Sequence, residues 1–141
     1  MLVKMFVFVI IIILFISRIK NTKTDLTKEE YEKKFEKEYH KNEKIYSNSE
    51  LFIKYFAFES TIYALCYGYI LFMNYGFFMN LLSLVQIITV FITVFITLNF
   101  GISDIFETNN TKVIYRKKYL LFNMILDYIY YPLSIIFLIF H

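Results

Sequence analysis

Residues 77–100 decide the fold: they read FFMNLLSLVQIITVFITVFITLNF and contain no Asp, Glu, Lys or Arg. The hydrocarbon core of a bilayer is crossed by roughly 20 mostly apolar residues in helical conformation. This stretch has that length and no charge, so it predicts a membrane-spanning helix.

Three other stretches have the length and composition of spans, and they cover residues 2–17, 51–73 and 119–140. The last of them contains the only proline, Pro132, which removes one backbone hydrogen bond and predicts a kinked helix. The first can also be read as a cleaved signal peptide, because Lys4 precedes an apolar run. Residues 15–18 (FISR) offer no small residues for cleavage, so we expect this helix to be retained.

Composition supports a membrane protein. Hydrophobic residues make up 58% of the 141, aromatic residues 21%, and the mean hydropathy is +0.52. Soluble domains contain roughly 45–50% apolar residues. Three glycines exclude Gly-rich phosphate loops, and the single cysteine excludes an internal disulfide. His40 and His141 are the only histidines and the sequence contains no recognisable metal motif, so it predicts no metal site and no cofactor.

Positive charge predicts the orientation. Residues 18–50 contain nine Lys or Arg, residues 103–118 contain four, and residues 74–76 contain none. Basic connections stay on the cytoplasmic or matrix side, and with four spans the first and third connections share a side. Both termini are therefore expected on the opposite side.

The polar segment after the first span predicts a helix outside the membrane, over residues 27–44. Thr27 and Glu30 have the spacing of a capping box. Tyr31, Phe35 and Tyr39 repeat every four residues and form an aromatic stripe, which we expect to contact a partner or the membrane domain; a solvated helix with incidental aromatics is the alternative. Because the nine basic and eight acidic residues of 18–50 nearly cancel, no nucleic-acid partner is expected.

These predictions give an all-α integral membrane protein with three to four transmembrane helices and one extramembrane amphipathic helix. Its predicted parts are transmembrane helix 1 (1–18), a polar loop (19–50), a transmembrane pair (51–102), a basic loop (103–118) and a fourth helix (119–141).

Two acids lie within the predicted spans, Glu59 and Asp127. An acid at membrane depth costs roughly 2.5 kcal/mol or more, so it is usually paired or functional. Lys54 lies about 140° around the helix from Glu59, so we expect the partner of Glu59 on another helix or chain. Glu59 then either accepts protons or donates one interhelical hydrogen bond. Asp127, near Pro132, could lie at a hydrated break in its helix.

Small residues predict how the middle spans pack. Ser60, Ala64 and Gly68 repeat at the four-residue spacing that lets membrane helices approach closely. A second face, on the third span, has the same spacing and consists of Thr89, Thr93, Thr97 and Gly101. We expect these two faces to pack against each other.

Residues 51–102 resemble chain 4L of respiratory NADH:ubiquinone oxidoreductase (complex I). Residues 55–60 (YFAFES) resemble the family's glutamate-bearing second helix, and residues 97–102 (TLNFGI) resemble its third, where a second glutamate precedes a glycine. Thr97 occupies the place of that glutamate. If the alignment with the family is shifted along the helix, Asn99 occupies it instead. The second glutamate is thus absent, the polar loop is longer, and a fourth span follows. The resemblance implies a proton path that includes Glu59 and Thr97 or Asn99, to which Asp127 adds a further acid.

The expected function is therefore a subunit of the proton-pumping arm of mitochondrial complex I, with no active site of its own. It implies a multi-pass inner-membrane protein with its basic loops in the matrix, and with other subunits and lipids as partners. Two alternatives remain open: a supernumerary structural subunit of another complex (cytochrome oxidase or ATP synthase), and a stand-alone secretory-pathway membrane protein or small transporter.

Overall fold

The protein is described by a computed structural model that covers residues 1–34, 37, 49–96 and 117–141. All regular secondary structure in these residues is helical, as predicted. The long helices are α1 (Leu2–Leu26), α3 (Ser49–Met73), α4 (Phe77–Ile96) and α6 (Lys117–Phe140). Each of the four is long and apolar enough to cross a membrane.

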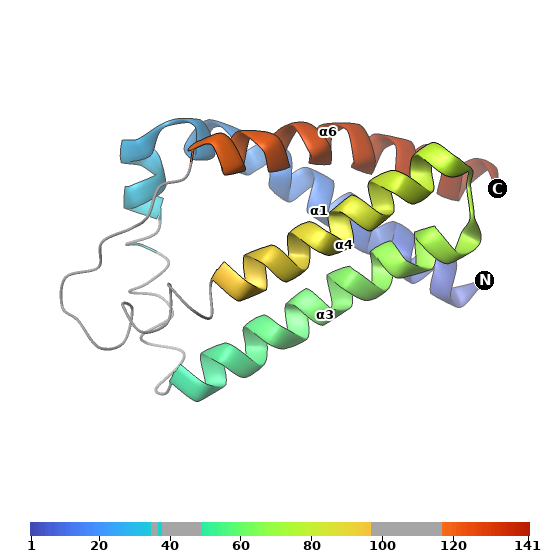
Figure 1. Cartoon of the computed structure of the whole chain (residues 1–141), viewed down its shortest axis with the longest axis horizontal. Helices are drawn as coiled ribbons and strands as arrows, with labels where there is room; N and C mark the ends of the chain where they lie inside the picture. Colours follow the sequence, from blue (N-terminus) through green and yellow to red (C-terminus); the bar gives the residue numbers. More distant parts are fainter. Residues whose placement is uncertain (35–36, 38–48, 97–116) are drawn as a thin grey trace.

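The helices pack as two antiparallel pairs (Figure 1). One pair is α1 with α6, the other is the hairpin of α3 and α4, and α4 also packs against α6. Both chain termini and the short α3–α4 connection lie at one end of the molecule. The start of α3, the end of α4 and the start of α6 lie at the other end, which we call the loop end.

A tight turn joins α3 to α4. Asn74 and Gly76 have positive φ angles of 52° and 110°, a backbone region that asparagine and glycine adopt at least cost. The Asn80 side-chain amide donates to the Asn74 side-chain oxygen at 2.5 Å, and the Asn80 backbone N–H donates to the Gly76 carbonyl at 3.0 Å. These bonds fix the hairpin without any charged residue.

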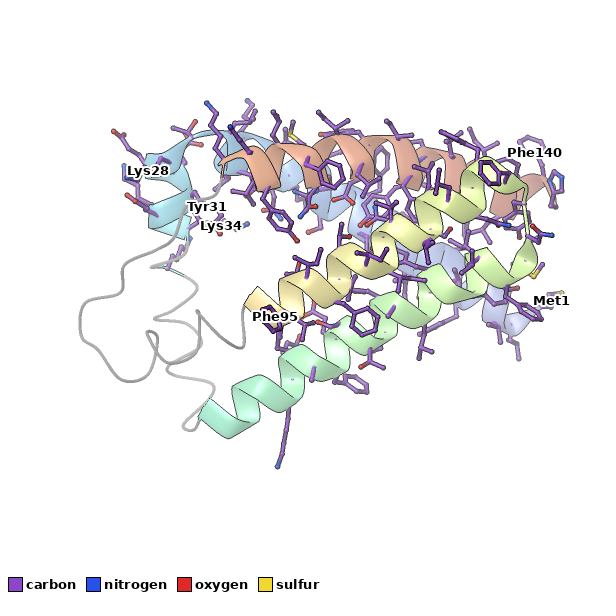
Figure 2. All side chains as sticks on the ribbon, in the orientation of Figure 1. Met1, Lys28, Tyr31, Lys34, Phe95 and Phe140 are labelled. Carbon is purple, nitrogen blue, oxygen red and sulfur yellow. The ribbon has the colours of Figure 1, made fainter. Side chains whose placement is uncertain are left out.

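The apolar core fills the half of the bundle nearest the termini, and all four helices contribute to it. It consists of Val7, Ile11, Cys66, Tyr67, Ile70, Met79, Tyr130, Tyr131 and Leu138. Large apolar side chains also project outward from every helix (Figure 2), including Leu65, Phe72 and Phe91, which are 68%, 85% and 64% exposed. Four apolar helices with an apolar outer surface are typical of a multi-pass membrane protein.

One predicted feature of the chain's course is wrong. Helix α1 does not end near residue 17 but continues to Leu26, so the first residues of the predicted polar loop are helical. The reason is that polar side chains of these last turns bind α6: Thr22 and Tyr128, for example, share a hydrogen bond of 2.8 Å. Helix α6 includes Pro132 within one continuous helix, and the kink at Pro132 stays a prediction.

The extramembrane helix is described only in part. Residues 28–34 are helical, and Thr27 precedes them in extended conformation, with its carbonyl accepting the first helical bond from the Tyr31 N–H at 3.0 Å. Thr27 is thus the N-cap, as predicted. Phe35 and Tyr39 lie outside the described residues, so the aromatic stripe stays a prediction.

Candidate functional site: a polar cavity between the helices

An arginine near the end of the apolar part of α1 holds two acids. The Arg18 Nε donates to the Asp127 Oδ2 at 2.6 Å, and its Nη1 donates to the Asp25 Oδ2 at 2.9 Å. The Arg18 side chain is 20% exposed, whereas those of Asp127 and Asp25 are 8% and 10% exposed. Charge-assisted bonds at these distances are strong, so this ion-pair cluster joins α1 to α6.

A glutamine on α4 completes the surroundings of Asp127. The Gln86 Nε2 donates to the Asp127 Oδ1 at 2.8 Å, and the Thr89 hydroxyl donates to the Gln86 carbonyl at 2.8 Å. Both Asp127 carboxylate oxygens therefore accept bonds, one from α1 and one from α4. Asp127 is 6% exposed and sits within a continuous helix, so the helix has no break at this position.

Glu59 has a different environment. It is half-buried on α3 and accepts a hydrogen bond from the hydroxyl of Tyr63, one turn later on the same helix. The expectation that its partner lies on another helix or chain is therefore wrong for the part of the protein that the structure describes. Tyrosine at i+4 satisfies the carboxyl locally and leaves its other oxygen, Oε2, without a described donor.

Glu59 and Asp127 line one cavity of about 250 Å³, between α3, α4 and α6 with Arg18 from α1. Side chains that can form hydrogen bonds make up most of the lining, and Phe56 and Val90 are its apolar members. The further polar lining residues are Ser60, Tyr63, Gln86, Thr89, Thr93, Asn123 and Tyr131. The sequence did not predict that the two acids share a cavity.

A second group of hydroxyls lies deeper, toward the termini. Tyr67 and Tyr131 share a hydrogen bond of 3.0 Å, and Ser83 and Tyr130 share one of 3.2 Å. All four side chains belong to residues that are at most 5% exposed. These bonds link α3 and α4 to α6 and satisfy polar groups that would be costly to bury alone.

The two predicted small-residue faces lie on α3 and α4, which pack against each other. Ser60, Thr89 and Thr93 line the cavity, and Thr93 shares a hydrogen bond of 2.7 Å with the Tyr119 hydroxyl of α6. A Cβ added to Gly68 would meet no atom within 4 Å, so its predicted role in a close approach is wrong. Ala64 is half-buried, and Thr97, Asn99 and Gly101 lie outside the described residues.

Sequence reasoning missed Arg18 and Asn123 as site residues. Arg18 was counted only as a loop charge, although an acid in one span and a base at the end of another are a recognisable signal for an ion pair. Asn123 gave no such signal. Within the described ranges, no group of three or more His, Cys, Asp or Glu could hold a metal ion.

No protein-family model matches the chain, and no curated protein or solved structure is significantly similar to it.

Proposed function

We propose that the chain is a membrane-embedded protein that passes protons through the polar cavity, with Glu59 as the carboxyl that exchanges them. The observation that carries the proposal is that Glu59 lines a cavity together with nine other residues whose side chains can form hydrogen bonds, between helices whose outer surfaces are apolar. A carboxyl in such a place is costly, and proton relays are among the functions that retain one.

The two acids have different roles in this proposal. Asp127 uses both oxygens to bind Arg18 and Gln86, so it positions α1, α4 and α6. Glu59 receives one hydrogen bond, from Tyr63. Glu59 lines the cavity and accepts a hydrogen bond from Tyr63, whereas both oxygens of Asp127 are bonded to Arg18 and Gln86, so Glu59 is the better proton acceptor.

The assembly that we propose is the membrane arm of mitochondrial respiratory complex I, with the basic connections in the matrix and other subunits and lipids as partners. The support is the resemblance of residues 55–60 and 97–102 to chain 4L. Native electrophoresis tests it: a tagged chain should migrate with NADH dehydrogenase activity. Migration with another complex, or alone, would reject this assembly.

Replacing Glu59 by Gln tests the proton path within that assembly. Gln keeps the size of the side chain and its hydrogen bond with Tyr63 but cannot exchange a proton. We expect the complex to assemble and its proton translocation per electron to fall. Glu30→Gln is the control, because Glu30 is exposed and lies outside the spans.

A second candidate function is that of a structural accessory subunit. One observation favours it: both carboxylate oxygens of Asp127 accept hydrogen bonds, one from Arg18 on α1 and one from Gln86 on α4. Asp127 therefore links three helices. In that case Glu59→Gln would leave both assembly and translocation unchanged, whereas loss of Arg18 would impair assembly.

A further inference from the structure

We propose that the cavity is a one-sided, water-filled vestibule that opens at the loop end and is closed toward the chain termini. This proposal rests on the proposed function and deepens it, because it names the side from which protons reach Glu59. Three observations carry it. A buried hydrogen-bond acceptor in the cavity has no described partner, the cavity-lining residues become less exposed away from the loop end, and apolar side chains fill the bundle between the cavity and the chain termini.

Water in the cavity would satisfy an acceptor that has no protein partner. The Asn123 side-chain oxygen is fully buried and receives no hydrogen bond in the described structure, although Asn123 lines the cavity. Buried acceptors of this kind are normally satisfied by ordered water. The cavity volume of about 250 Å³ far exceeds the roughly 10–15 Å³ that one water needs. Several waters therefore fit, and hydroxyls such as Ser60 and Thr93 can hold them.

Along α4 and α6, exposure of the lining residues falls with distance from the loop end. Thr93, on the last turn of α4, is exposed, and Asn123, on the second turn of α6, is half-buried. Gln86 and Asp127 lie farther from that end and are 4% and 6% exposed. This gradient indicates that the mouth lies at the loop end.

The inner end of the cavity is closed by packed side chains. Tyr131 lines the cavity, and its hydroxyl is engaged by Tyr67 at 3.0 Å. Beyond this pair lie core residues from α3, α4 and α6: Ile70, Met79 and Leu138, which are at most 3% exposed. A close-packed apolar layer excludes water, so the vestibule does not continue to the terminal end.

Thiol labelling of the full chain in lipid vesicles tests the proposal. The background variant is Cys66→Ala, into which Ser60→Cys or Thr61→Cys is introduced. The two positions lie at the same depth of α3, but Ser60 lines the cavity whereas Thr61 is exposed on the outer surface. A charged, membrane-impermeant thiosulfonate reacts with thiolates, which form only where water reaches. We therefore expect Ser60→Cys to react about tenfold faster than Thr61→Cys.

The reaction should also be one-sided. Lys118→Cys, at the exposed start of α6, identifies the loop end, and Ser60→Cys should react only when reagent is added on that side. The native Cys66, which is 2% exposed in the core, should react from neither side in the wild-type chain.

Three results separate the possible failures. If Ser60→Cys reacts no faster than Thr61→Cys while Lys118→Cys reacts fast, or if it reacts from the opposite side, the vestibule is overturned. If Ser60→Cys and Thr61→Cys both react as fast as Lys118→Cys, the outer surface is in water, and the membrane proposal fails as well. If the labelling is as expected but Glu59→Gln translocates protons normally, the vestibule stands and the proton path fails.

Discussion

At the scale of single residues, Arg18 has the strongest expected effect on stability. It is the one described cation bonded to Asp127, and it also binds Asp25. Removing the cation of a buried ion pair leaves the Asp127 carboxylate without its charge partner, at a cost of about 3–5 kcal/mol. Arg18→Met should therefore lower the unfolding midpoint of the purified protein in detergent strongly, as measured by thermal denaturation.

Two further variants test whether the effect of Arg18→Met comes from the loss of its ion pair with Asp127. Lys20→Met removes an exposed charge from the same helix and should change the midpoint little. The double variant Arg18→Met with Asp127→Leu removes both principal charges and should recover part of the loss. A double variant that is less stable than Arg18→Met would show that the pair does not act as a unit.

At the scale of the elements, α1 should behave as an integral helix of the bundle. Ile11 is 0% exposed in the core, whereas Ile13 is 58% exposed on the outer surface of the same helix. Ile11→Ala should cost about 2 kcal/mol, the lower end for such a change, because lipid is as apolar as the core and only packing is lost. Ile13→Ala should be nearly neutral. Equal midpoints for both variants would argue against the packing of α1.

Two glycines should respond in opposite ways to the same substitution. Gly68 is helical, and a Cβ there meets open space, so Gly68→Ala should stabilise the chain by up to about 1 kcal/mol through helix propensity. Gly76 has a φ of +110°, so Gly76→Ala should destabilise it by about 1–2 kcal/mol. Thermal midpoints of the two variants measure both effects, and a loss of stability in Gly68→Ala would point to a close contact at that helix face.

The elements also show how far the sequence could predict this structure. Apolar runs predicted all four long helices, because a stretch that is long and apolar enough to cross a membrane can be recognised from the local sequence alone. The predicted end of α1 was wrong. The last turns of this helix are polar and are stabilised by contacts of Arg18 and Thr22 with α6. Such contacts join residues more than 100 positions apart, and periodicity within one helix carries no information about them.

Part of the candidate site could also be predicted from the sequence. Glu59 and Asp127 stand out as acids in apolar helices. The partners of Asp127 lie on other helices and depend on how the helices are rotated about their axes, whereas the partner of Glu59 lies four residues later on its own helix. Tyr63 was equally compatible with lipid or core, and Gly68 had the spacing of a packing residue but faces open space. The sequence thus showed which residues could exchange protons or form ion pairs, but the partners that decide the role of each residue became known only from the structure.

At the scale of the whole molecule, the long helices form a bundle with both termini at one end (Figure 1). The half near the termini contains the apolar core together with the Tyr67–Tyr131 and Ser83–Tyr130 hydroxyl pairs, and the half near the loop end contains the cavity lined by Glu59 and Asp127. This asymmetry gives the molecule a closed end and a hydrated end. The central claim is that Glu59 exchanges protons with water in the hydrated half.

Infrared difference spectroscopy of the full chain in lipid vesicles tests that claim most directly. The carboxyl C=O stretch reports a protonated acid, and subtracting the pH-induced spectrum of Glu59→Gln from that of the wild type isolates Glu59. We predict a carboxyl band that changes with pH in the wild type, shifts promptly in deuterated buffer because water reaches the cavity, and is missing from Glu59→Gln. Identical pH-induced spectra for the two proteins would contradict the account.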